Sequence, residues 1–276
     1  MIRIHSFVSA RALAAVALAA IGQVALWAAP AWSYPGGTPS YQTDVAPFCS
    51  SCHSSLSEDA LKGAGERATK ELADNKHLAV IQAGEKGYAE LSEAERATLV
   101  DHIRATDANT KIALEYPPQV EKGATFQVRV LVTGGAGPAI GVGLVDRAHR
   151  WFARPASAAG WTVVGAPSII GPKGPQSDWI AKRPESMGRN ITFVNVTGVE
   201  SNAATGQWAE SKVIYNLRAP DKPGVYPLVG VLFYGTEKAS PLGYKTNPMG
   251  FRQVRGGFTG GSGRVEFSES HVINVK

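Results

Sequence analysis

Gly224-Val225-Tyr226-Pro227-Leu228-Val229-Gly230-Val231-Leu232-Phe233-Tyr234 is an uncharged, apolar stretch near the C-terminus of this 276-residue chain. The turn-forming residues 219–223, Ala-Pro-Asp-Lys-Pro, precede it. A run rich in Val and aromatic residues that follows a turn signal predicts a buried β-strand. We therefore expect this stretch to be a core strand of a β domain.

Similar strand patterns occur on both sides of this stretch, separated by turns rich in Gly, Pro and Asn. Seven or eight strands without a convincing helix predict an antiparallel β-sandwich over residues 116–276. Besides 224–234, the expected strands are 126–132, 140–145, 161–164, 191–196, 212–217, 264–267 and 272–275.

The preceding residues differ in composition and in charge. Residues 34–115 carry 8 Lys and Arg against 13 Asp and Glu, whereas residues 116–276 carry 18 against 10. Pro117-Pro118 disfavours a helix that continues through this point. We predict two modules, 34–112 and 116–276, in which the first is acidic and helical and the second is a basic β-sandwich.

The basic second module indicates an anionic partner, such as an acidic redox protein, a polysaccharide or the cell envelope. A scattered surplus of positive charge that merely solvates the surface explains the count equally well. Nucleic acid is not expected as a partner.

Residues 49–53 spell Cys-Ser-Ser-Cys-His, and the two cysteines of this C-x-x-C-H motif are the only ones in the chain. In such a motif each thiol forms a thioether to the porphyrin edge, and the histidine binds the iron. We expect one covalent haem c on Cys49 and Cys52, with His53 as the proximal iron ligand.

Two other sites share the cysteine spacing of this motif. A thioredoxin-type dithiol follows a buried strand, which the residues before Cys49 do not predict. Half of a zinc site needs two further ligands at close spacing, and the next histidines, His77 and His102, are far apart. The flanking residues therefore favour haem over both alternatives.

The N-terminus has the pattern of a secretory signal peptide. Arg3 and Arg11 precede an apolar, Ala-rich run at 12–29, and Ala31-Trp32-Ser33 places small residues at a cleavage site. We expect cleavage after Ser33, so that 1–33 is removed and the protein is periplasmic or extracellular in a bacterium. An uncleaved membrane anchor is the alternative; the mature chain has no later stretch of membrane-spanning length.

Helical patterns follow the haem motif. Ser57 is a suitable N-cap for a helix with apolar residues at 61, 64, 68 and 72. A short apolar segment at 78–81 stops at Gly84. Ser92 and Glu95 form a capping box for a last helix with a buried stripe. That stripe consists of Leu99, Val100 and Ile103.

Over about residues 40–106 this order resembles the class I cytochrome c domain. The matching pieces are the C-x-x-C-H motif, Ile-Gln-Ala-Gly at 81–84 and Leu-Ser-Glu-Ala-Glu at 91–95. The resemblance implies a small helical haem domain with a methionine ligand in the loop before the last helix. Here that loop, 85–90, contains no methionine.

Four possibilities therefore remain for the sixth iron position. His77 lies in the same module, at the start of a short helical segment. His102 lies on the last helix, and Met249 lies in the second module. The fourth possibility is water or an open position. His77 is the distal candidate that we carry forward.

The second module resembles reeler-like and other immunoglobulin-like sandwiches that accompany C-x-x-C-H segments in exported proteins. The resemblance rests on residues 219–226 and a final strand at the C-terminus. It implies a scaffold or docking role. No set of residues in this module indicates an enzymatic site, so a non-enzymatic electron carrier is expected.

Together these features predict an exported monohaem c-type cytochrome that transfers one electron at a time to a redox partner protein. A haem protein with an open distal face that binds small gases or peroxide is the first alternative. A structural or adhesive envelope protein with a subsidiary haem is the second.

Overall fold

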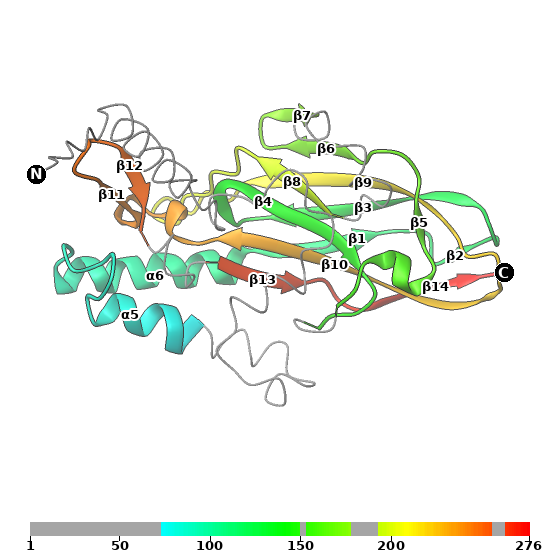
Figure 1. Ribbon diagram of the computed structural model, residues 1–276, viewed down its shortest axis with the longest axis horizontal. Coiled ribbons are helices and arrows are strands. Elements are labelled where there is room, and N and C mark those ends of the chain that lie inside the picture. The colour runs from blue at the N-terminus through cyan, green and yellow to red at the C-terminus, as the bar shows by residue number, and fades with distance from the viewer. Residues whose placement is uncertain (1–72, 150–152, 178–192, 256–262) are drawn as a thin grey trace, which may run out of the picture. The chain divides into compact units, whose positions relative to one another are not determined.

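The computed structural model describes residues 73–149, 153–177, 193–255 and 263–276 (Figure 1). The predicted signal peptide and the C-x-x-C-H motif lie outside these residues. The described part consists of two packed β-sheets with a few helices beside one end of them (Figure 1).

Among the described residues, three helical elements come first. A π-helical turn, η1 (Ala73–Leu78), runs directly into α5 (Ala79–Gln82), and Gly84 follows with a φ of +68°. That left-handed conformation suits glycine and ends the helix as the sequence predicts. The longer helix α6 (Glu93–Asn109) starts with the predicted capping box between Ser92 and Glu95.

The predicted stripe of α6 is also confirmed. Leu99, Val100 and Ile103 are buried and pack with residues of η1, α5 and the loop between the helices. The other buried members of this apolar cluster are Leu78, Ile81, Tyr88 and Leu91. Leu242, which lies after the core strand, packs against the same cluster, so the helices share apolar contacts with the β domain.

The first sheet has the strand order β1-β3-β9-β6-β7, and β5 also pairs with β9. All of its pairings are antiparallel. Its strands are β1 (Lys111–Glu115), β3 (Thr125–Thr133), β5 (Thr162–Val163), β6 (Ser168–Gly171), β7 (Gly174–Gln176) and β9 (Glu210–Arg218).

The second sheet has the order β2-β14-β10-β4-β8, and β13 pairs with β10 beyond the end of β14. The pairing of β2 with β14 is parallel, and the others are antiparallel. Its strands are β2 (Gln119–Val120), β4 (Ala136–Val145), β8 (Phe193–Thr197), β10 (Gly224–Gly235), β13 (Gly263–Phe267) and β14 (His271–Val275).

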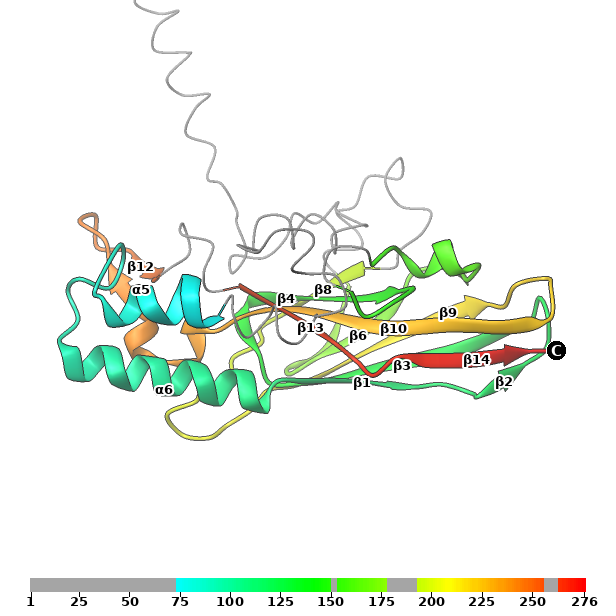
Figure 2. The same ribbon diagram turned by 90° about the horizontal axis from the view of Figure 1, so that it is seen from below.

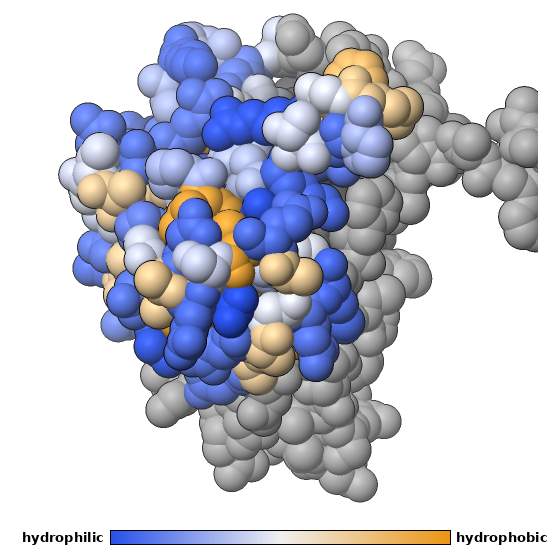
Figure 3. Space-filling view, turned by 90° about the vertical axis from the view of Figure 1, so that its left-hand side faces the viewer, coloured by the Kyte–Doolittle hydropathy of each residue, from blue (hydrophilic) through white to orange (hydrophobic). Residues whose placement is uncertain are grey.

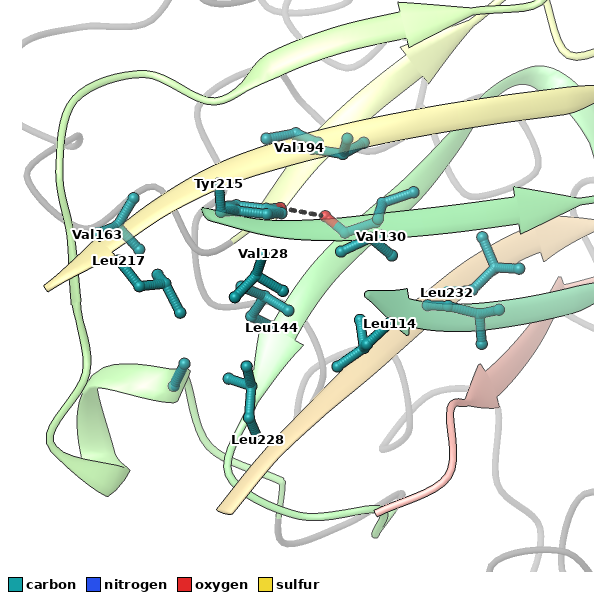
Figure 4. Close-up of a cluster of buried hydrophobic side chains, with 14 of the residues drawn as sticks. Leu114, Val128, Val130, Leu144, Val163, Val194, Tyr215, Leu217, Leu228 and Leu232 are labelled. Atoms are coloured by element: carbon teal, nitrogen blue, oxygen red, sulfur yellow. Dashed lines mark hydrogen bonds between the residues drawn. The ribbon is translucent and has the colours of Figure 1, made fainter. Parts of the chain in front are cut away.

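The inner faces of the two sheets form one apolar core, which makes this domain a β-sandwich (Figures 2 and 4). Val128 and Val130 of β3 meet Leu144 of β4 and Leu228 of β10 there. Tyr215 of β9 is buried in this core and donates a hydrogen bond from its hydroxyl to the carbonyl oxygen of Val142, at 3.2 Å (Figure 4).

Strand β10 is the core strand that the sequence predicts, and it is buried on both faces over its second half. Leu228 and Leu232 face the inner core, while Val229, Val231 and Phe233 belong to a second apolar cluster. The apolar run lacks strict alternation because both of its faces are buried.

After β10 the chain makes short 3-10 turns, η4 (Glu237–Ala239) and η5 (Pro241–Gly243), and then a two-stranded hairpin. The hairpin consists of β11 (Tyr244–Thr246) and β12 (Arg252–Val254). A further 3-10 turn, η2 (Ala156–Ala159), precedes β5. No helix in the described ranges is both long and apolar enough to cross a membrane.

The predicted strands match β3, β4, β5, β8, β9, β10, β13 and β14 within the described residues. The first sheet also contains a strand that lies before the residues in which strands were expected. Strand β1 begins at Lys111, before the expected start at residue 116, and only Thr110 separates it from α6. Pro117 and Pro118 lie between β1 and β2, inside the sandwich.

Candidate functional site: a buried polar cluster between helices and sandwich

His77, the distal ligand candidate, is buried with 1% of its surface exposed. Its Nε2 is hydrogen-bonded to the carboxylate of Glu237, and Nη2 of Arg264 lies 2.9 Å from its Nδ1. A guanidinium can only donate, so Nδ1 accepts from Arg264. Both ring nitrogens of His77 therefore have protein partners.

Glu237 begins η4 directly after the core strand, and its side chain is fully buried. Besides His77, the hydroxyl of Tyr88 donates to its Oε1 at 2.7 Å and the hydroxyl of Thr236 donates to its Oε2 at 2.9 Å. Burial by itself raises the pKa of the Glu237 carboxyl. The imidazole of His77 and the two hydroxyl donors outweigh burial and lower that pKa.

Tyr88 comes from the loop at 85–90, where the class I cytochrome resemblance places a methionine. Its ring is fully buried and its hydroxyl points at Glu237. Burial, together with the adjacent Glu237 carboxylate, raises the pKa of the Tyr88 hydroxyl far above its ordinary value. Tyr88 therefore stays protonated, as a hydrogen-bond donor, at any physiological pH.

Arg264 of β13 continues the cluster toward α6. Its Nε lies 3.1 Å from Oδ2 of Asp107, and the hydroxyl of Tyr234 donates to Oδ1 of Asp107 at 2.9 Å. Burial raises the pKa of Tyr234, and Asp107 adds to this effect, so this hydroxyl also remains a donor. Helix α6 and strands β10 and β13 are thereby joined by charge-assisted hydrogen bonds.

A second arginine fixes the same loop. Arg255, which is 6% exposed, donates from Nη1 to the carbonyl oxygen of Gly87 at 2.6 Å and lies 3.2 Å from the carboxylate of Glu90. Its Nε donates to the carbonyl oxygens of Leu242 and Tyr244. The loop at 85–90 is thus tied to the hairpin as well as to η4.

We call His77, Tyr88, Asp107, Tyr234, Glu237 and Arg264 the buried polar cluster. It joins the helices to the sandwich through side chains whose donors and acceptors complement one another. Such a cluster can fix the helices against the sandwich and can keep the buried carboxyl of Glu237 ionised. Among the described residues, no three His, Cys, Asp or Glu side chains gather as metal ligands.

The other predicted site residues are scattered. Cys49, Cys52 and His53 lie outside the described residues. His102 of α6 is half-buried, and its Nδ1 lies 2.8 Å from the hydroxyl of Ser240 in the sandwich. Met249 is 76% exposed in the turn of the β11–β12 hairpin. His77 and His102 thus each contact the segment that follows β10, through Glu237 and Ser240, whereas Met249 is exposed.

Viewed from the end that carries α5, α6 and the hairpin, the described surface is mostly hydrophilic around a small apolar area (Figure 3). The buried polar cluster was not predicted from the sequence. Its only signals are charged residues next to apolar strands, namely Glu237 after β10 and Arg264 within β13. Their partners lie 160 and 187 positions away, which no local pattern indicates.

No protein-family model matches this chain, and no curated protein matches it. Among solved structures, it is similar to the CARDB domain of the PF1109 protein from Pyrococcus furiosus, solved with di-metal ions. Identity is 10%, the TM-score is 0.24, and the match covers 61% of this chain and 90% of that one.

A structure titled BspA_C_WT matches at 7% identity with a TM-score of 0.29, over 60% of this chain and 50% of that one. The PapD-like domain 7 of human CEP192 matches at 8% with a TM-score of 0.20, over 61% and 85%. Scores this low carry no argument about function. The β-sandwich assignment rests on the strand pairing and on the shared core described above.

Proposed function

We propose that this chain is an exported monohaem c-type cytochrome that transfers single electrons, with the β-sandwich as its scaffold and docking module. The observation that carries the proposal is the C-x-x-C-H motif at 49–53. Two thiols and an imidazole at this spacing are the donor set that haem c requires. The haem supplies the reversible change of iron between its ferrous and ferric states.

The described helices support this proposal. Segment α5, the left-handed Gly84 and the capping-box start of α6 follow the order of the middle and last helices of a class I cytochrome c domain. The finer identities, a class I-like haem domain and a reeler-like or immunoglobulin-like sandwich, are part of the proposal.

The buried polar cluster gives the helices a fixed position on the sandwich. Sites on rigid elements hold their geometry better than sites on free loops. In the proposed function, the cluster and Arg255 keep the helical segments in one arrangement while the iron changes charge. The basic sandwich would then present the haem to an acidic redox partner or to the envelope.

The contacts of His77 argue against this residue as the sixth iron ligand. To bind iron, His77 would have to release either Glu237 or Arg264, which are both buried. Leaving a buried charge with fewer partners is costly. The proposal therefore assigns His77 to the buried polar cluster and leaves His102, Met249 or water for the sixth position.

One observation favours a second function. The loop at 85–90 lacks methionine, and its Tyr88 side chain is committed to Glu237. A haem without a protein ligand on its distal face would bind small gases or peroxide rather than only transfer electrons. A ferric absorption spectrum separates the two functions: low-spin haem supports electron transfer, and high-spin haem supports ligand binding.

The central test is expression of the full chain in a bacterial host that matures c-type cytochromes. Mass spectrometry should show one haem per exported chain. Replacing Cys49 and Cys52 by Ala should abolish the added mass, whereas His53→Ala should keep the attachment and alter the spectrum. An unmodified mass for the wild-type chain would refute the proposal.

A further inference from the structure

An open cavity of about 710 Å³ lies between the residues that follow β8 and the segment from η4 to β12, and none of the buried polar cluster residues lines it. Sites for small ligands usually measure about 300–1,000 Å³. Its walls include Glu200, Asn202 and Gln207 on one side and Lys238, Tyr244 and Arg252 on the other. The lining is therefore mostly polar and contains two cations.

The two cations have little local compensation. Within the described residues, no carboxylate lies within ion-pair distance of Lys238 or Arg252. The guanidinium of Arg252 lies over the ring of Tyr244, with its carbon 3.5 Å from the ring centre. This contact orients Arg252 without neutralising it.

Lys238 is half-buried at the cavity wall. Burial lowers the pKa of Lys238, and the nearby positive charge of Arg252 lowers it further, while Glu200 opposes both effects. An anion between the two cations would relieve this unfavourable charge arrangement. Glu200, a carboxylate of the lining, is exposed and pairs with Lys173 at 3.6 Å.

The neutral lining indicates what the rest of a ligand would look like. Oδ1 of Asn202 accepts the backbone N–H of Ala204, which leaves its amino group as a donor. Gln207 adds a second side-chain amide at the same wall. Amides suit a hydroxyl-rich ligand, and the Glu200 carboxylate disfavours one with several negative charges.

We propose that this cavity binds an acidic sugar of one or two rings, whose carboxylate lies between Lys238 and Arg252. The site is independent of haem attachment and goes beyond electron transfer. It would give the sandwich a direct contact with an acidic polysaccharide of the cell envelope. The Glu200 carboxylate would limit the site to ligands with about one negative charge per ring.

The test is isothermal titration calorimetry of the purified full chain with digalacturonate, at low and at physiological salt. Maltose serves as the uncharged disaccharide, and inorganic phosphate as the anion without a sugar. Digalacturonate should bind, with weaker affinity at higher salt. The other two probes should bind at least tenfold more weakly.

The variants Lys238→Gln and Arg252→Gln should each weaken digalacturonate binding by about tenfold or more, because each removes a charged hydrogen-bond partner. Lys245→Gln is the matched control: it removes one positive charge from the same hairpin, outside the cavity lining, and should stay within about twofold.

Glu200→Gln provides a change of opposite sign that misfolding cannot imitate. It removes this carboxylate of the lining and should tighten digalacturonate binding by about two- to threefold. The proposal is overturned if digalacturonate does not bind, if maltose or phosphate binds as tightly, or if both cation variants bind like the wild type. Weaker binding by Glu200→Gln would also overturn it.

Discussion

Replacing Glu237 by Ala should be among the most destabilising single changes in the protein. The carboxylate is fully buried and accepts hydrogen bonds from His77, Tyr88 and Thr236. Removing it takes a charged acceptor away from each of these three buried donors. Breaking a buried charged network in this way costs about 3–5 kcal/mol.

The assay is urea unfolding of the full chain, followed by tryptophan fluorescence. With a slope of about 2 kcal/mol per M, a loss of this size lowers the midpoint by roughly 2 M. Glu237→Gln retains the shape and one acceptor oxygen but loses the charge. Since charge-assisted hydrogen bonds are about twice as strong as neutral ones, its cost should be about 1–2 kcal/mol.

Glu115→Ala is the matched control, because it also removes a carboxylate paired with a positive charge. Glu115 is 54% exposed and lies 3.5 Å from Arg129 at the surface. Such exposed pairs contribute about 0–1 kcal/mol. If Glu237→Ala lowers the midpoint no more than Glu115→Ala does, the buried polar cluster does not hold the helices on the sandwich.

The surroundings of Glu237, His77 and Gly243 give three more tests. The free energy of unfolding of the wild type should exceed that of Glu237→Gln by a constant amount above about pH 5, and the difference should shrink below the unfolded pKa of about 4.3. The pKa of Glu237 is lowered in the folded state, so the stability that its charge provides is lost as the pH falls through this folded-state pKa. Paired unfolding curves in which the difference between the two proteins grows toward acid pH would contradict this. His77→Ala should leave the spin state of the ferric haem unchanged while lowering stability, because both ring nitrogens already have protein partners; a low-spin spectrum that turns high-spin would instead establish His77 as an iron ligand. Gly243→Ala should destabilise the protein by about 1–3 kcal/mol, because a Cβ at this position would clash with the carbonyl oxygen of Glu237. Thermal unfolding with an unchanged Tm would contradict this close backbone contact.

Much of the sandwich could be predicted from local patterns. Strands β3 and β9 alternate between buried and exposed residues, so their period of two is visible in the sequence. Helix α6 carries its own start signal in Ser92 and Glu95. These features depend on neighbours within a few positions, which is the range over which hydrophobic periodicity and capping act.

Several short strands escaped prediction because they have few residues on which a pattern can show. Strands β2, β6, β7, β11 and β12 have two to four residues each and owe their extended form to pairing with longer strands. Strand β1 does alternate, but it follows α6 so closely that the change in composition seemed to lie after it.

Local patterns in the sequence were enough to predict the core strands, the capped last helix and a motif for haem attachment. The partners of His77, in contrast, are visible only in the folded protein. Its spacing from His53 makes it a candidate iron ligand, but Glu237 and Arg264, 160 and 187 positions later, occupy both of its ring nitrogens. The sequence shows which chemistry a side chain can perform. Its partners depend on how elements that are distant in the chain pack together, because a buried polar group needs hydrogen bonds from the residues that the fold places around it.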